Sequence, residues 1–322
     1  MTASGVFRRS ARRGLAALAS GVVAAALLAS PVGRVQTLAA PQDPVLTFRA
    51  SADFVGLDVS VQRAGRPVTG LLAADFIVLD NGVRQDVADV SYERLPIDVT
   101  VALDVSASVT GPVLDQLRQA VRQLEGDLGR DDRLRMIAFN MQVALLADFA
   151  PAASHRDTEL DGLQGGGGSS ILDAVAVALA TPAPTGRRQM IVLFTDGEDS
   201  SSITSAATVL DVARRTTPTL HVVLAAPPEL GTLRPPQPAA REVAAQQVFA
   251  RLAAETGGTL VSISRGASLA SMFRRSLDEF RASYVLHFVP RGVELRGAHT
   301  LSVRINRPGT FDVRARSGYV WR

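Results

Sequence analysis

The pattern of apolar and polar positions divides the chain from residue 54 onward into three regions of two kinds. Residues 54–92 contain short runs in which apolar and polar residues partly alternate, as in strands with one buried face. The middle of the chain instead contains the mostly β-branched run Ile97–Leu103 and the fully apolar run Met190–Phe194, with stretches of helical periodicity between the predicted strands. Runs of these two kinds predict buried strands that helices cover on both faces. From Tyr284 onward the pattern returns to short β segments separated by prolines.

The middle region predicts a regular alternation of strands and helices. The predicted strands are 97–103, 133–139, 142–149, 190–194, 220–225 and 260–263. The predicted helices are 114–128, 171–179, 206–215, 241–256 and 269–281, with a proline-rich loop at Pro227–Pro238. This order predicts an α/β fold, with a Rossmann-like, doubly wound, mainly parallel sheet.

The flanking β segments predict a second, smaller unit. Asn81-Gly82 precedes the predicted strand Val83–Tyr92 and is a hairpin signal, because both residues tolerate positive φ. We expect the C-terminal segments to pair with the N-terminal ones in one β-sandwich-like module, which makes the α/β domain an insertion. The predicted divisions are a leader at 1–39, an N-terminal β module at 40–95, the α/β domain at 96–281 and C-terminal β segments at 282–322.

Residues 1–39 have the pattern of a signal peptide. Arg8–Arg13 form a basic segment, Leu15–Ala29 is apolar, and small residues follow at Thr37–Ala40. The apolar run is shorter than the about 18 residues expected of a membrane span. We therefore expect a periplasmic or secreted protein, held at a membrane only if the leader stays uncleaved. The pattern leaves the Sec and twin-arginine routes both open.

Composition excludes several classes of function. The chain has no cysteine, which excludes disulfide scaffolds, Cys-ligated zinc, iron–sulfur clusters and thiol catalysis. The formal charge is +3, but the arginines of residues 1–39 account for the excess, and the remaining residues are slightly acidic. We therefore expect no nucleic-acid partner.

Three short segments place small oxygen-bearing side chains at or beside the predicted carboxyl ends of strands. They are Asp104–Ser108 (DVSAS), Gly165–Ser170 (GGGGSS) and Thr195–Asp199 (TDGED). Ligands bind at this edge in open α/β sheets. Carboxylates and hydroxyls, without thiols or imidazoles, suit a hard cation, above all Mg²⁺, with Mn²⁺ or Ca²⁺ as alternatives.

This arrangement resembles the von Willebrand factor type A domain that carries a metal-ion-dependent adhesion site (MIDAS). The resemblance covers about residues 96–281: a strand, the DxSxS motif, a helix, a glycine-rich loop with a hydroxyl, and a strand ending in TDG. The flanks, among them GRPVTGLLAADFIVLDNGVRQDV, also resemble exported bacterial VWFA-related proteins of the acidobacterial type. These resemblances imply a non-enzymatic module for protein binding or cell adhesion.

The resemblance also implies a set of metal ligands, namely Asp104, Ser106, Ser108, Ser169 and Asp196. In the family, the DxSxS serines and a threonine of the second loop coordinate the metal through hydroxyls. The two aspartates often act through water, and a carboxylate of the partner protein completes the shell. The threonine is replaced here by Ser169, or by Ser170 if the loop is threaded one residue later. Serine keeps the oxygen but lacks the methyl group that fixes the rotamer, so we expect weaker metal binding.

Two other functions compete with this hypothesis. In a purely structural domain the site would be vestigial, and Asp104 and Asp196 would merely cap neighbouring helices. A metal-assisted hydrolase would need a general base, and only Glu198 and Asp199 lie near the motif, where we expect solvated loop acids. The chain contains no GxSxG motif, its histidines are scattered, and its glycine run lacks the lysine of a P-loop. We therefore predict a binding protein whose partner presents an acidic residue.

Overall fold

The computed structural model describes residues 54–91, 95–155, 157–182, 184, 186–225, 240–263 and 268–321. The predicted signal peptide and the predicted loop Pro227–Pro238 lie outside the described residues. The described part is a mixed α/β structure with three sheets and six α-helices, which confirms the α/β prediction. In this part of the chain, no helix has both the length and the hydrophobicity needed to cross a bilayer.

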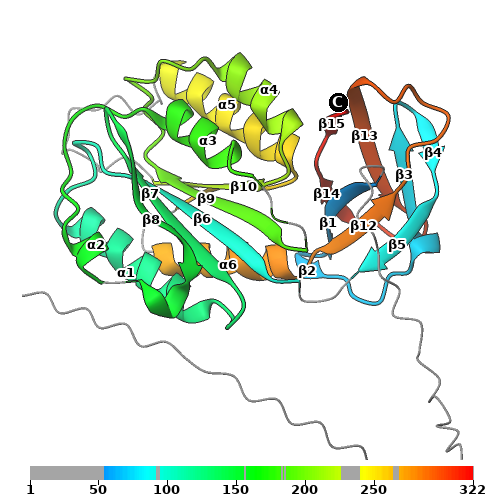
Figure 1. Ribbon diagram of the computed structural model, residues 1–322, viewed down its shortest axis with the longest axis horizontal. Helices are drawn as coiled ribbons and strands as arrows, with labels where there is room; N and C mark the ends of the chain where they lie inside the picture. Colours follow the sequence, from blue (N-terminus) through cyan, green and yellow to red (C-terminus); the bar gives the residue numbers. More distant parts are fainter. Residues whose placement is uncertain are drawn as a thin grey trace, which may run out of the picture. The chain divides into compact units, whose positions relative to one another are not determined.

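Six strands form the central sheet, in the order β11-β10-β9-β6-β7-β8 (Figure 1). Their bounds are β6 Ile97–Asp104, β7 Arg133–Phe139, β8 Val143–Pro151, β9 Arg188–Thr195, β10 Thr219–Leu224 and β11 Leu260–Ser262. Neighbouring strands from β11 to β7 are parallel, whereas β8 runs antiparallel to β7. Every residue of β6 and β9 is buried, as expected of central strands that helices cover on both faces.

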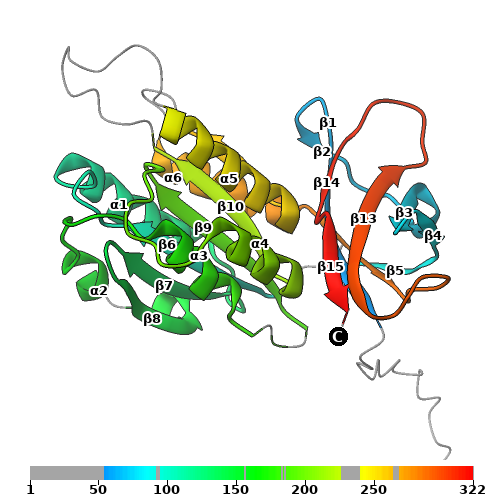
Figure 2. The same cartoon turned by 90° about the horizontal axis from the view of Figure 1, so that it is seen from above.

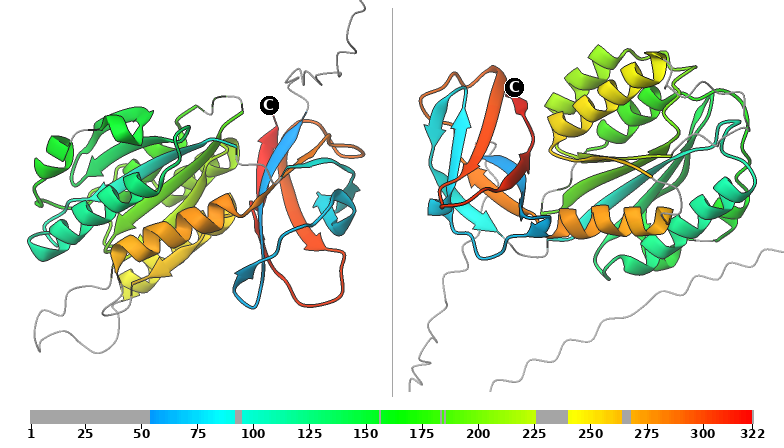
Figure 3. Two further views of the ribbon diagram at one scale, coloured as in Figure 1. Left: turned by 90° about the horizontal axis from the view of Figure 1, so that it is seen from below. Right: turned by 180° about the vertical axis from the view of Figure 1, so that it is seen from behind.

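Helices pack against both faces of this sheet (Figures 2 and 3). Their bounds are α1 Pro112–Asp127, α2 Asp157–Asp161, α3 Ile171–Leu179, α4 Ala206–Arg215, α5 Ala240–Thr256 and α6 Leu269–Arg281. Helices α1 and α6 bury Leu117 and Phe273 in one apolar cluster with Val101 of β6. Helices α3, α4 and α5 contribute side chains such as Val175 and Leu252 to a second cluster. The apolar stripes of the helices therefore supply two cores, one for each face.

Two smaller sheets form the flanking β module. One has the order β14-β1-β12-β5, with β2 beside β1, and the other has the order β15-β13-β3-β4. The strands are β1 Val55–Arg63, β2 Arg66–Pro67, β3 Phe76–Asp80, β4 Val83–Gln85, β5 Val87–Ser91, β12 Tyr284–Phe288, β13 Gly297–Ile305, β14 Asp312–Ala315 and β15 Gly318–Trp321. Strand β1 pairs with β12 and β14, and β3 pairs with β13. Strands from before and after the central sheet therefore share one apolar core, which includes Leu57, Val78 and Tyr284.

The hairpin predicted at Asn81-Gly82 is confirmed, with φ of 47° and 81° at the two residues. The single strand predicted over Val83–Tyr92 is wrong. Strand β4 pairs with β3, whereas β5 belongs to the other sheet and pairs with β12. The buried Gln85 ends β4, and its side-chain amide exchanges two hydrogen bonds with the main chain of Arg291. These bonds occur where the chain crosses between sheets, and alternation of apolar residues cannot reveal such a crossing.

Candidate functional site

The carboxylate of Asp104 lies fully buried at the carboxyl edge of the central sheet, where β6 ends. Three donors hold it. The Ser106 amide donates to Oδ1 at 2.9 Å, the Ser169 hydroxyl donates to Oδ2 at 3.0 Å, and the Thr195 hydroxyl donates to Oδ2 at 2.7 Å. The three segments singled out in the sequence therefore meet at one side chain.

The electrostatics at Asp104 favour a cation. Burial raises the pKa of Asp104 above its ordinary value, because the charged form loses its contact with water. The hydrogen bonds from Ser106 and Thr195 oppose this rise, and the negative charge of Asp196 adds to it. The described loops around Asp104, at 105–111, 140–142, 163–170 and 196–205, contain acidic residues but no arginine. A positive ion would therefore offset negative charge that these described loops leave uncompensated.

Ser106 and Ser108 follow Asp104 in the segment that leads to α1. Their hydroxyl oxygens lie 3.1 Å apart. Ser106 is buried and Ser108 is exposed, so the pair extends from the buried carboxylate to the surface. Two hydroxyl oxygens that lie side by side next to a carboxylate can coordinate the same cation.

The glycine-rich loop packs its main chain directly on this DVSAS segment. The Ala107 amide donates to the carbonyl oxygen of Gly167 at 3.0 Å. A Cβ atom at Gly165 would overlap the carbonyl oxygen of Val109, so a larger residue would force the two segments apart. The glycine at this position therefore allows the close approach that brings the following serines to Asp104.

The structure distinguishes the two serines between which the sequence left a choice. Ser169 and Ser170 are both buried, with exposed fractions of 2% and 1%. The hydroxyl of Ser169 donates to Asp104, whereas that of Ser170 donates to the carbonyl oxygen of Asn140 at 2.6 Å. Ser169 thus faces the buried carboxylate, and Ser170 ties the loop to the turn between β7 and β8.

Asp196 follows β9 and is partly exposed. Its Oδ1 accepts a hydrogen bond from the Glu198 amide at 3.2 Å, and Gly197 between them has a φ of 90° that favours glycine. Glu198 is exposed, and Asp199 Oδ1 accepts the Ser202 amide at 3.2 Å. Asp199 therefore stabilises its own loop, while Asp196 acts on Asp104 through its charge.

Thr195 is a site residue that the sequence reasoning missed. It is fully buried at the end of β9, and its hydroxyl donates to Asp104 while accepting the Gly197 amide at 3.0 Å. The signal was present in the TDG motif, whose threonine is the last residue of an apolar strand. A hydroxyl at that position orients the carboxylate of the neighbouring strand β6.

The donors at this edge fit a hard cation in their chemistry. Among the described residues, no group of three His, Cys, Asp or Glu side chains is placed to hold a metal ion. The set around Asp104 is of another kind, because it combines two carboxylates with the hydroxyls of Ser106, Ser108 and Ser169. Oxygen donors of this sort suit Mg²⁺. The four histidines pair elsewhere, with Glu125, Thr259, Asp89 and Asp80.

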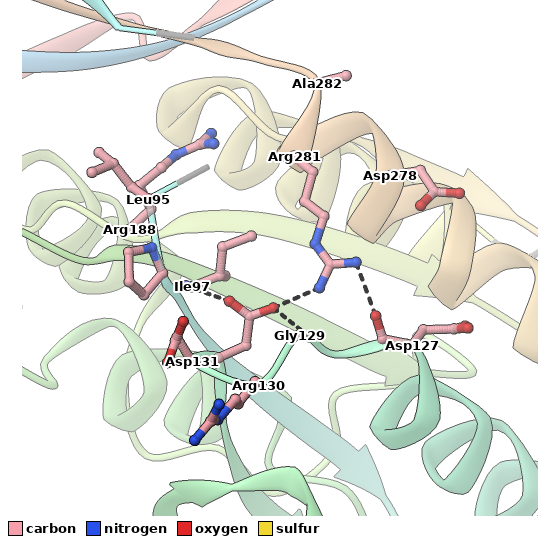
Figure 4. A pocket seen from close by; sticks show the side chains of 12 residues that line it. Leu95, Ile97, Asp127, Gly129, Arg130, Asp131, Arg188, Asp278, Arg281 and Ala282 are labelled. Carbon is pink, nitrogen blue, oxygen red and sulfur yellow. Dashed lines mark hydrogen bonds and ion pairs between the residues drawn. The ribbon is translucent and has the colours of Figure 1, made fainter. Parts of the chain in front are cut away.

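A hollow of about 840 Å³ lies at the opposite, amino edge of the central sheet (Figure 4). Ile97, Asp132 and Arg281 line it. The Arg281 guanidinium donates to Asp132 at 2.6 Å and to the carbonyl oxygen of Asp127 at 2.9 Å, and Asp132 also accepts the Ile97 amide. These central charges are neutralised within the hollow, and we assign no ligand to it.

Comparison with protein families matches residues 99–198 to VWA_2, the von Willebrand factor type A domain. The match begins within β6 and ends at Glu198, so it includes all five predicted metal ligands. Comparison with curated proteins finds no significant match. The central part of the chain is therefore similar in sequence to a von Willebrand factor type A domain.

Several solved structures are similar to the chain. The conserved hypothetical protein BatB from Bacteroides thetaiotaomicron is 18% identical, with 57% of this chain and 98% of that chain covered and a TM-score of 0.45. A von Willebrand factor type A protein from Catenulispora acidiphila is 13% identical, with 84% and 74% covered and a TM-score of 0.45. Proximal thread matrix protein 1 from the mussel byssus, with a zinc-occupied MIDAS motif, is 11% identical, with 61% and 48% covered and a TM-score of 0.46. Similarity at this level supports no particular ligand or partner.

Proposed function

We propose that the chain is an exported protein-binding module that uses a divalent cation, above all Mg²⁺, to bind an acidic side chain of a partner protein. The cation ligands are Asp104, Ser106, Ser108, Ser169 and Asp196. The convergence of three separate segments on the buried carboxylate of Asp104 carries this proposal. The match to a von Willebrand factor type A domain, which generally serves protein interaction or adhesion, supports it.

The proposal includes the organisation of the chain. Residues 96–281 form a doubly wound domain of the von Willebrand factor type A kind, inserted in a β module built from residues 40–95 and 282–322. The pairing of β1 with β12 and of β3 with β13 supports this division. Residues 1–39 are a signal peptide that directs the chain to the periplasm or to the outside of the cell.

Each residue of the site has a distinct role in this proposal. Ser106, Ser108 and Ser169 hold the cation through neutral hydroxyls, and Asp104 and Asp196 supply negative charge. Neutral ligands leave a cation better able to attract an anion than a fully anionic set would. The acidic residues of the described loops would repel an acidic partner, and a bound cation supplies the positive charge that attracts its carboxylate. Thr195 keeps the carboxylate of Asp104 in position.

A structural domain with a vestigial site is the second candidate, and one observation favours it. Both oxygens of Asp104 already accept hydrogen bonds, and the hydroxyls of Ser106 and Ser108 can bond to each other. The site can therefore hold together without an ion. The same contacts are compatible with metal binding, because a hydroxyl that donates its proton keeps lone pairs for a cation. A metal-assisted hydrolase has less support, since Asp199 already accepts a main-chain amide.

Thermal melts in Mg²⁺, Mn²⁺, Ca²⁺ or EDTA test the metal site. We expect the divalent cations, at about ten times their Kd, to raise the Tm of the wild type by a few degrees. The Tm of Asp104→Ala should not change when a cation is added. Capture of a partner from an envelope extract should require the cation and Asp104. If no cation shifts the Tm, the vestigial site is correct. If capture persists in EDTA and in Asp104→Ala, metal-dependent binding is wrong.

A further inference from the structure

We propose that Met141 and Ile203 form an apolar rim beside the candidate metal site and select partners in which a large apolar residue lies next to the acidic one. This inference rests on the function proposed above and adds its specificity. The occupant is a peptide segment of a partner protein, with one acidic side chain and a neighbouring leucine, isoleucine, phenylalanine or methionine.

Both residues expose large apolar side chains on the loops that follow strands at the carboxyl edge. Ile203 is 96% exposed in the loop between β9 and α4, and Met141 is 64% exposed at the turn between β7 and β8. Single exposed apolar residues are ordinary on protein surfaces. The exposure of these two side chains indicates a binding surface because hydrogen bonds fix both loops and attach them to the segment that contains Ser169.

The main chain around Ile203 is fixed although its side chain is in solvent. The Ile203 amide donates to Asp173 Oδ2 at 3.0 Å, and the Thr204 amide donates to Asp173 Oδ1 at 2.8 Å. The Ser202 hydroxyl in turn accepts the Asp173 amide at 3.3 Å. A preorganised loop loses little main-chain conformational entropy when a partner covers one of its side chains. Ile203 therefore presents an exposed apolar side chain from a fixed main chain, which suits a residue that contacts a partner.

Met141 lies against the glycine-rich loop. A Cβ atom at Gly167 would be 3.2 Å from Cγ and Sδ of Met141. A Cβ atom at Gly168 would be 3.7 Å from Met141 Cγ on one side and would overlap the Ser201 hydroxyl on the other. Gly168 therefore lies between Met141 and the serine stretch that leads to Ile203. Gly167 and Gly168 contribute no side chain to the surface between the two apolar residues, where the small side chains of Ser200 and Ser201 lie beside the glycines.

One short segment anchors both loops and also supplies the candidate ligand. The amides of Ser200 and Ser201 donate to the carbonyl oxygen of Ser169 at 2.9 Å each, and the Ser200 hydroxyl accepts the Ser169 amide at 2.9 Å. The Ser170 amide and hydroxyl both donate to the carbonyl oxygen of Asn140, at 2.7 and 2.6 Å. The rim is therefore built on the same main chain that positions the Ser169 hydroxyl.

The charges nearby restrict which segments fit. Asp196 and Asp199 are partly exposed and Glu198 is exposed, while the described loops at this edge contain no arginine. A cation can accept one partner carboxylate, but a second acidic residue would face these acids. An apolar neighbour avoids that repulsion and covers Met141 or Ile203. A single acid with an apolar neighbour thus fits better than an acidic run.

A library of random heptapeptides displayed on phage tests the rim. Phage are bound to the immobilised chain in Mn²⁺ and eluted with EDTA. We expect enrichment of a single Asp or Glu with a large apolar residue within two positions. On the double variant Met141→Ser, Ile203→Ser, the acidic enrichment should remain and the apolar enrichment should disappear. The affinity of a selected peptide should fall about tenfold, as for two apolar contacts that are partly buried.

The matched control is Leu72→Ser, because Leu72 is 68% exposed but belongs to the β module. This variant should keep both enrichments. If the wild type enriches acidic peptides without apolar neighbours, the rim is wrong but metal-dependent binding stands. The same conclusion follows if the double variant still enriches apolar neighbours. No EDTA-eluted peptide at all would overturn both proposals. The double variant should keep the Mn²⁺ shift in Tm, and its loss would overturn a rim separate from the metal site.

Discussion

The hydroxyl of Ser169 donates to Oδ2 of Asp104 at 3.0 Å, although the two residues are 65 positions apart in the chain. Thr195 donates to the same oxygen, so one buried atom joins β6, the glycine-rich loop and β9. A carboxylate deprived of water is unfavourable in its charged form, and burial raises the pKa of Asp104 accordingly. A bound cation would offset part of that penalty, which connects the packing of the loops to the proposed function.

Ser169→Ala should remove most of the stabilisation that Mg²⁺ gives the chain, because it deletes one ligand oxygen. Ser170→Ala is the matched control, since it deletes an equally buried hydroxyl that bonds to Asn140 instead. Mg²⁺ at about ten times its Kd should raise the free energy of unfolding of the wild type and of Ser170→Ala by about 1.4 kcal/mol, and that of Ser169→Ala by little. In EDTA, the free energy of unfolding of each variant should be about 1 kcal/mol lower than that of the wild type, because a buried hydrogen bond is lost. Thermal melts in both buffers measure these terms, and equal Mg²⁺ responses would exclude Ser169 as a ligand.

Local patterns were sufficient to predict the succession of the central strands and helices along the chain, except for the short helix α2. Helices cover both faces of β6 and β9, and that burial leaves a signal in each run by itself: Met190–Phe194 is fully apolar, and Ile97–Leu103 is mostly β-branched although it includes Asp98 and Thr100. The position of Asp104 followed from the same signal, since it directly ends such a run. The three oxygen-bearing segments were therefore recognisable without knowledge of their contacts.

The particular side chains that meet between segments were not predictable in this way. The choice between Ser169 and Ser170 depends on which hydroxyl faces β6 after the loop has folded, and the two residues look alike in the sequence. The role of Thr195 likewise depends on the strand beside it. The division of Val83–Tyr92 between two sheets has the same origin, because alternation shows that one face is buried but not which sheet buries it.

Arg188→Met should destabilise the chain by about 3 kcal/mol. The buried Arg188 guanidinium, at the start of β9, donates to Asp58 at 2.7 Å, to the carbonyl oxygen of Phe280 at 2.8 Å and to the Ser283 hydroxyl at 2.6 Å. Its removal leaves the Asp58 carboxylate without this donor and removes a charged partner from the Ser283 hydroxyl, while the Phe280 carbonyl keeps its hydrogen bond from Ser283. Arg215→Met is the control, because that arginine is exposed in a pair within α4 and contributes about 0.5 kcal/mol. Urea unfolding that gives equal losses would contradict the buried role of Arg188.

Gly258→Ala should cost roughly 2–4 kcal/mol. Gly258 follows α5 and approaches β10 so closely that a Cβ atom would overlap the carbonyl oxygen of Leu220. Backbone cannot yield as a flexible side chain would, so the substitution must separate α5 from β10. Gly126→Ala is the opposite case, because Gly126 lies in α1 with open space around its Cβ position, and alanine there should stabilise by about 0.5–1 kcal/mol. Changes of the same sign in urea unfolding would refute this account.

His221 should make the chain less stable as the pH falls below 6.5. Burial in β10 lowers the pKa of His221 to about 3, and the positive charge of Arg314 acts in the same direction. The unfolded chain therefore binds a proton near pH 6.5 that the folded chain takes up only near pH 3. The contribution of neutral His221 to the free energy of unfolding is fully present above pH 6.5. Below that pH, it falls by up to about 1.4 kcal/mol per pH unit. His221→Phe should flatten the dependence of the free energy of unfolding on pH between pH 6.5 and 5, measured by urea unfolding. A slope in His221→Phe identical to that of the wild type would show that His221 is not held neutral.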